Sequence, residues 1–171
     1  MQTEITLGQV RLALAMPVNQ NGLPVGVAPF EKLAQASLSS AMMFWIGNKI
    51  KPDLQKHFED MELRRVELIK KHGFPIKDPA GEVIPERFDF TPEGREAFNA
   101  EFDELCAQVV TIDARTFTPE EFEKYESALA LVKFNGNDMG ALDWLIKEPE
   151  QAKTAAVENI ADHQKAKEAA G

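Results

Sequence analysis

A long run of apolar residues at helical spacing, from Pro29 to His72, constrains the fold of this chain most strongly. Proline is tolerated in the first turn of a helix, and after Pro29 an apolar or small side chain recurs every three or four residues. The spacing predicts a helix over most of residues 30–50. Its stripe is formed by Phe30, Leu33, Ala34, Ser37, Leu38, Ala41, Met42 and Trp45, and Phe44 and Ile46 widen it.

The second half of this stretch predicts a helix over most of residues 53–71. Basic residues before Gly73 are typical of a helix C-terminus. Pro52 lacks a backbone N–H, so it either kinks one helix or begins a new one. We therefore expect one kinked helix or two helices that meet near Gly47–Pro52. The second stripe contains Leu54, Phe58, Met61 and Leu68.

Turn and strand signals predict a small β element downstream. Asp78-Pro79-Ala80-Gly81 has the residue order of a type I turn, which predicts a β-hairpin near residues 74–84. The β-branched run near residues 109–115 predicts a strand. The hairpin is the natural partner of this strand, so we expect one small sheet beside the helices.

Capping residues mark further helices. Thr91-Pro92 and Thr118-Pro119 each place an N-cap before a proline at the first helical position. They predict helices over residues 92–107 and 119–129. Asp138 is expected to cap a short helix that contains Met139, Leu142, Leu145 and Ile146.

The N-terminal residues 4–16 fit two interpretations. Thr6 is a suitable cap for a short helix, whereas Val10, Leu12 and Leu14 also alternate with other residues as in a strand. The helix is favoured because leucine and alanine outnumber β-branched residues. The turn-rich sequence that follows is expected to be a loop or a small hairpin.

These elements predict a mainly α fold with a minor β component: a helical hairpin or bundle, a small β-hairpin or sheet, and an extended C-terminal helix. We expect residues 1–148 to form a single helical domain and residues 149–171 a helical tail that begins at Pro149. Only Val157 and Ile160 are large and apolar in this tail. Because so little apolar surface stabilises a helix poorly, contact with another chain is expected to order it.

The sequence contains no recognisable constellation for catalysis or metal binding. The three histidines, His57, His72 and His163, are far apart, and there is no phosphate-binding glycine loop or nucleophile turn. Cys106 follows an apolar residue and is expected to be a buried structural thiol. The acidic clusters are expected to form solvated helix faces. We therefore expect no enzyme, no catalytic, metal or cofactor-binding residue, and no cofactor. These clusters are Glu59, Asp60 and Glu62, and Glu101, Asp103 and Glu104.

Composition excludes further classes of function. The formal net charge is −9, which disfavours a nucleic-acid surface because phosphate contacts need a basic face. No apolar run approaches the roughly 20 residues of a membrane span. The first residues lack the pattern of a signal peptide, and the single cysteine is consistent with a reducing compartment. We expect neither nucleic-acid nor membrane partners.

A protein interface has two candidate parts. Phe44 and Trp45, beside Met42 and Met43, form either a binding stripe or part of the core, and core packing is the favoured interpretation. Val157 and Ile160 are the candidates in the tail. The predicted interface residues are therefore Phe44, Trp45, Val157 and Ile160.

The order of these motifs resembles that of small uncharacterised proteins encoded in tailed-bacteriophage genomes. The resemblance covers about residues 30–146. It includes a helical pair that ends in KKHG, a polar hairpin, the sequence FDFTPEGREAFNAEFDELCAQVVTIDARTF, and a closing DMGALDWLI. The matching positions are Phe98, Glu101, Glu104 and Leu105 at a helix end, Val110 and Ile112 in a strand, and Leu142 and Leu145 in the last helix.

The resemblance implies a non-enzymatic structural or assembly-associated protein of a bacteriophage. Such a protein is expected in the virion or the host cytoplasm, and its partners would be other phage particle proteins, copies of itself, or both. The alanine-rich tail departs from the pattern, so the resemblance says nothing about what the tail binds. The alternative function is a small chaperone-like or regulatory module that binds one soluble partner.

Overall fold

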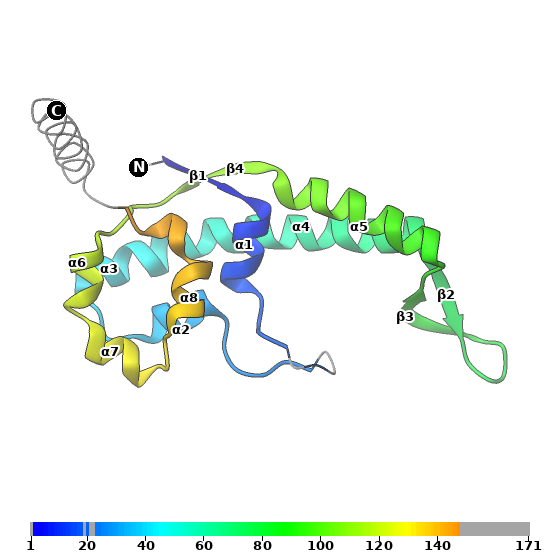
Figure 1. Cartoon of the computed structure of the whole chain (residues 1–171), viewed down its shortest axis with the longest axis horizontal. Helices are drawn as coiled ribbons and strands as arrows, with labels where there is room; N and C mark the ends of the chain where they lie inside the picture. The colour runs from blue at the N-terminus through cyan, green and yellow to red at the C-terminus, as the bar shows by residue number, and fades with distance from the viewer. Residues whose placement is uncertain (1, 19, 21–22, 148–171) are drawn as a thin grey trace, which may run out of the picture.

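Helices dominate the computed structural model, which describes residues 2–18, 20 and 23–147, and the minor β component consists of two small antiparallel sheets (Figure 1). The predicted mainly α fold class is therefore confirmed. The elements are β1 (Gln2–Thr6), α1 (Leu7–Leu14), α2 (Pro29–Gln35), α3 (Ser40–Trp45), the π-helical turn η1 (Ile46–Ile50), α4 (Lys51–His72), β2 (Phe74–Lys77), β3 (Val83–Asp89), α5 (Pro92–Ala107), β4 (Val109–Asp113), α6 (Pro119–Glu123), α7 (Glu126–Leu131), α8 (Gly136–Ala141) and the 3₁₀ turn η2 (Asp143–Leu145).

The N-terminal segment contains both a strand and a helix. Thr6 ends β1 and caps α1 in a reciprocal capping box with Gln9, as its position before the apolar residues predicts. β1 pairs antiparallel with β4, with Thr3 opposite Ile112. The expectation that β4 would pair with the hairpin is wrong. β1 and β4 each direct an apolar face to the same core, whereas the hairpin lies at the far end of α4 and α5 (Figure 1).

The helical break within residues 29–72 lies earlier than expected. α2 ends at Gln35, and the Ser39 side chain then caps α3 by accepting a hydrogen bond from the Met42 N–H. The chain remains helical from Ser40 to His72, so near Gly47–Pro52 it forms one helix that contains the π-helical turn η1, and the alternative of two separate helices is wrong. A proline ring crowds the carbonyl four residues before it and donates no hydrogen bond. The wider turn η1 directly precedes Pro52, where the Lys51 N–H bonds to the Ile46 carbonyl.

Two other helix predictions need correction. Helix α5 has the predicted bounds and the predicted Thr91 cap, but residues 119–129 divide into α6 and α7 at Lys124–Tyr125. The cap of α8 is Asn135 and not Asp138. Asp138 lies one turn inside the helix, where its carboxylate accepts a hydrogen bond from the Asn135 N–H at 2.8 Å.

One hydrophobic core gathers residues from both ends of the described chain. A nearly buried ion pair links α2 to α8, because Lys32 Nζ lies 2.9 Å from Asp138 Oδ2. The helical spacing predicts that eight large apolar residues face the core, and four of them are buried: Phe30, Leu33, Leu54 and Leu105. The other four are half-buried against the core or against each other: Trp45, Phe58, Phe98 and Phe102. The largest fully buried side chains include Phe30, Phe117, Ile5, Leu33, Ile46, Ile50, Leu54, Met61 and Ile112.

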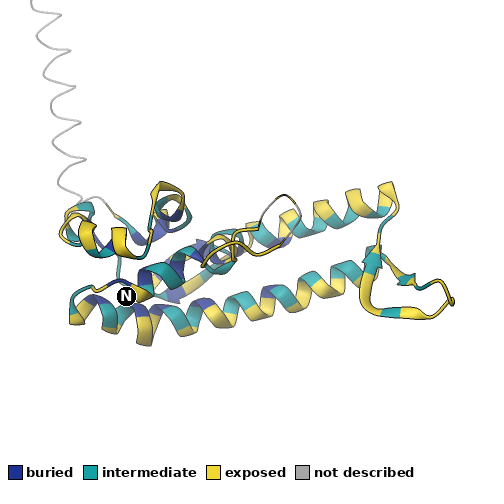
Figure 2. Cartoon of the chain, turned by 90° about the horizontal axis from the view of Figure 1, so that it is seen from below, coloured by how far each residue is buried: buried dark blue, intermediate teal, exposed yellow. Residues whose placement is uncertain are grey.

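Residues 62–104 form a projecting arm in which no residue is buried (Figure 2). The arm contains most of α4, the β2–β3 hairpin and most of α5. The hairpin has the predicted turn, since the Gly81 N–H donates to the Asp78 carbonyl at 2.9 Å. We call the remaining described residues the body.

No helix among the described residues is long and apolar enough to cross a membrane.

Candidate interaction surfaces

The structure places the adjacent residues Phe44 and Trp45 in different environments. Phe44 is 53% exposed, whereas Trp45 is half-buried and packs against the core. They therefore do not form a single exposed stripe. Val157 and Ile160, like the whole predicted tail, lie outside the described residues.

The acidic clusters lie at the surface. Glu59, Asp60, Asp103 and Glu104 are exposed, and Glu62 pairs with Arg65 at 2.7 Å. Within residues 2–18, 20 and 23–147 no three His, Cys, Asp or Glu side chains converge as a metal ion requires.

Glu101 takes part in a contact that joins the two helices of the arm. Its carboxylate binds Lys71 Nζ at 2.6 and 2.7 Å, and its Oε1 lies 3.0 Å from His72 Nε2. The hydrogen bond from Lys71 lowers the pKa of Glu101, and the charge of Lys71 and the bond to His72 add to this effect. The carboxylate is thus held ionised as a structural link between α4 and α5.

Cys106 is half-buried rather than fully buried as expected. Burial raises the pKa of its thiol, and the nearby charge of Arg11 opposes this shift. A raised pKa reduces the thiolate fraction, so the environment disfavours a nucleophile.

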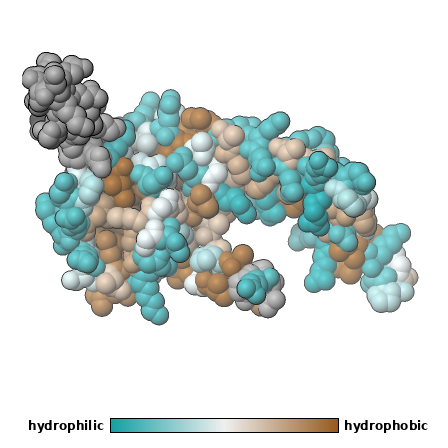
Figure 3. Space-filling model, in the orientation of Figure 1, coloured by the Kyte–Doolittle hydropathy of each residue, from teal (hydrophilic) through white to brown (hydrophobic). Residues whose placement is uncertain are grey.

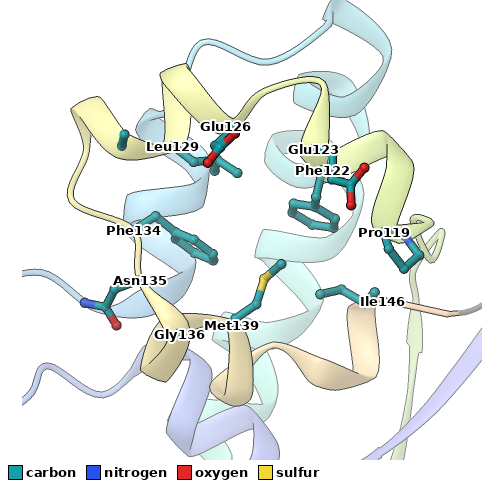
Figure 4. A pocket seen from close by; sticks show the side chains of 11 residues that line it. Pro119, Phe122, Glu123, Glu126, Leu129, Phe134, Asn135, Gly136, Met139 and Ile146 are labelled. Atoms are coloured by element: carbon teal, nitrogen blue, oxygen red, sulfur yellow. The ribbon is translucent and has the colours of Figure 1, made fainter.

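An open apolar groove lies between α6, α7 and α8 in the body. Phe122 and Leu129 are buried, and Phe134, Met139 and Ile146 are half-buried around the same hollow (Figure 4). Its volume is about 800 Å³. Glu123 and Glu126 are exposed among the lining residues. The arrangement is suited to an apolar segment whose flank carries positive charge.

The sequence does not reveal the groove, because its residues belong to separate predicted helices. Phe122 and Leu129 were expected to line one helix, and Met139 and Ile146 another. The feature of the sequence that indicates such a groove is the shortness of these helices. Elements of five or six residues have too little surface to cover one another completely.

The loop between α1 and α2 exposes a second apolar surface (Figure 3). No charged residue occurs from Leu12 to Phe30, although 27% of the chain is charged. A hydrogen bond from the Val25 N–H to the Pro17 carbonyl, 2.7 Å, holds the two sides of the loop together. The loop thus projects an uncharged apolar surface from the body. Its exposed large side chains are Met16, Val18, Leu23, Val25 and Val27, and Leu12 precedes them.

The arm exposes a third set of apolar side chains. Leu63 and Val66 lie one turn apart on α4 and are 66% and 39% exposed. Phe74 and Val83 lie on the paired strands of the hairpin at the tip and are about half exposed. The arm thus exposes apolar side chains on both its shaft and its tip.

Comparison of the chain with protein-family models, with curated proteins and with solved structures gives no match.

Proposed function

We propose that this chain is a non-enzymatic, assembly-associated or structural protein of a bacteriophage particle, and that it acts through protein–protein contacts. The arm is the observation that carries this proposal. From residue 62 to residue 104 the backbone is almost entirely helix and strand, yet no side chain is buried. The half-buried contacts between its two helices supply its apolar packing.

A long folded arm without a core is costly for a chain that acts alone. Most of the stability of a helix in a protein comes from packing its apolar face, and two packed helices bury only part of each face. The exposed Leu63, Val66, Phe74 and Val83 add apolar surface that water disfavours. A partner that covers this surface would stabilise the arm and gain affinity from the same burial.

The phage assignment is supported by the motif resemblance, and part of that motif lies on the arm. Phe98 stacks on Phe102 with ring centroids 5.6 Å apart, and Glu101 makes the ion pair with Lys71. The stacked rings lie within α5, and Glu101 is the motif residue that links α5 to α4. A family that retains them would retain the arm, and a projecting arm is a suitable device for joining neighbouring subunits.

The apolar groove favours a second candidate, a chaperone-like or regulatory module for one soluble partner. Such a module would hold one segment of its partner in the groove. It would form a discrete complex and would be absent from the finished particle.

The experiment changes the arm and follows the chain into particles produced from the genome that encodes it. Leu63→Glu with Val66→Glu puts two charges on the shaft of the arm. Leu131→Glu is the control, since Leu131 is 84% exposed and lies in the body. We expect particles to contain the unaltered chain and the control, and incorporation of the arm variant to fall about tenfold or more.

Circular dichroism and thermal melting establish that both variants remain folded. The second candidate would be favoured by two results together. The unaltered chain would be absent from finished particles, and it would form a discrete complex with one soluble protein. Equal incorporation of all three proteins would refute the role of the arm.

A further inference from the structure

The groove is a concave apolar surface, and its floor is already part of the core. Phe122 is 3% exposed and lies against Phe117 with ring centroids 5.9 Å apart. Phe134 and Met139 stand around the hollow without filling it (Figure 4). An apolar segment that entered here would meet a preformed surface, with little cost of reorganisation.

The described chain ends at the edge of this groove. Ile146 lines the groove, and the Lys147 N–H donates to the Phe117 carbonyl at 2.9 Å, which fixes this last segment on the body. Residues 148–171 follow. In their sequence Val157 and Ile160 are three positions apart, and Lys153 precedes Val157 by four. Side chains at these spacings share one face of a helix.

We propose that the groove binds the C-terminal segment of a second copy of this chain. Val157 and Ile160 of one copy fill the hollow of the other, and Lys153 lies at its acidic rim near Glu123 and Glu126. This is recognition of an amphipathic helix by an apolar groove, in which residues at i, i+3 and i+4 act as anchors. The inference rests on the proposed function in one respect, that the chain acts through protein–protein contacts.

The position of the proline indicates a second copy rather than the same chain. Pro149 is suited to the first helical position, so the sequence predicts a tail helix that begins two residues after Lys147. In such a helix Val157 and Ile160 are about 12 and 16 Å from Pro149 along the axis. A helix that begins so close to the groove leaves no linker by which its anchors could turn back into a hollow of about 800 Å³ in the same chain. We therefore infer that the anchors enter the groove of another copy.

A contact of this kind joins two different surfaces, since each copy offers one groove and one tail. Reciprocal exchange of tails between two copies gives a closed dimer, whereas repetition of the contact along successive copies gives a larger ring or an open filament. Either form leaves the arms available for other partners.

The test uses full-length proteins and sedimentation velocity at about 1 to 100 µM. Met139→Glu places a charge on the groove wall, and Leu131→Glu is its control on an exposed site that does not line the groove. Val157→Glu with Ile160→Glu disables the tail, and Ala155→Glu is the control on the opposite helix face. We expect the unaltered chain and both controls to form concentration-dependent multimers, and the groove and tail variants to associate at least about tenfold more weakly.

Mixing the two defective variants gives the sharpest result. One intact tail then meets one intact groove, so we expect a 1:1 heterodimer and nothing larger. A monomeric unaltered chain at every concentration would overturn the proposal, as would a mixture that remains monomeric. If Leu23→Glu in the apolar loop prevents association while the tail variant does not, the loop is the occupant and the proposal is wrong.

A peptide binding measurement covers the case in which Met139→Glu fails to fold. A fluorescein-labelled peptide of residues 148–171 is titrated with the full-length Val157→Glu/Ile160→Glu protein, whose groove is intact. We expect saturable binding that the same peptide with both glutamates lacks. Equal binding of the two peptides would contradict the proposal. Because these tests use this chain alone, their failure leaves the particle incorporation of the arm variants as a separate result.

Discussion

The body and the arm of this protein are stabilised by different kinds of contact. In the body, short helices and the β1–β4 pair share one core that excludes water from Phe30, Leu33, Phe117 and Ile112. In the arm, two long helices and a hairpin are held by half-buried rings, caps and exposed ion pairs. Regular secondary structure thus forms in the arm without a buried core. A region that has helices and strands but no core depends on contacts outside itself.

The largest expected difference is between matched aromatic truncations. Phe117 is fully buried, so Phe117→Ala should lower the free energy of unfolding of the body by about 4 kcal/mol. Phe98 is half-buried between Phe90 and Phe102, so Phe98→Ala should cost about 1.5 kcal/mol, confined to the arm. Urea unfolding followed by circular dichroism measures both changes. Equal losses would break the distinction between the two regions.

The ion pair in the body should matter more than those in the arm. Lys32→Met leaves the carboxylate of Asp138, only 7% exposed, without its cation. Because an unpaired buried charge is strongly unfavourable, we expect a loss of about 3 kcal/mol. Lys71→Met in the arm leaves its partner carboxylate in contact with water and should change stability far less than Lys32→Met does. A comparable loss in the two variants, measured by urea unfolding, would contradict this account.

Close backbone packing at the tip of the arm gives a local test. A Cβ atom at Gly94 would lie 2.5 Å from the His72 carbonyl oxygen, so Gly94→Ala should force α5 away from α4 at a cost of about 1–3 kcal/mol. Gly140→Ala in α8 meets no atom within 4 Å and serves as the matched control. Amide exchange should accelerate in the arm of the first variant only. Faster exchange in the body of that variant would show that the regions are coupled.

The smallest expected effect is the pH dependence of the arm. The pKa of Glu101 is lowered in the folded protein, so its contribution to stability is present above about pH 4.3, the ordinary value for glutamate. That contribution is lost as the pH falls through the lowered value. The arm of Glu101→Gln should therefore exchange faster than that of the unaltered chain at pH 7, and the difference should vanish at strongly acidic pH. A difference that persists in acid would exclude the ionised carboxylate as its cause.

Local signals in the sequence were sufficient for much of the fold. Thr6, Thr91 and Thr118 each precede residues that need a cap, and the structure confirms all three caps. The turn at residues 78–81 is likewise determined by adjacent residues. Such features depend on hydrogen bonds over a few positions, which a single sequence displays directly.

The remaining features depend on distant partners. β1 and β4 are far apart in the sequence, since Thr3 pairs with Ile112, and nothing near either strand identifies the other. The stripe of α4 continues evenly from Leu54 and Met61 to Leu68, yet only the first two are buried because the body ends there. The groove combines side chains from three short helices. Whether an apolar helix face is exposed thus depends on which other element packs against it. The spacing of residues along one helix does not contain this information.

Native-state hydrogen exchange of the isolated full-length protein tests the central claim most directly, because it reports opening free energies residue by residue. We expect amides of the body, such as those of Val10, Leu54 and Ile112, to exchange only through global unfolding. Amides of the arm, such as those of Leu68 and Phe98, should open at a free energy at least about 2 kcal/mol lower. A single opening free energy shared by body and arm would show that the arm is stable on its own and would contradict the account.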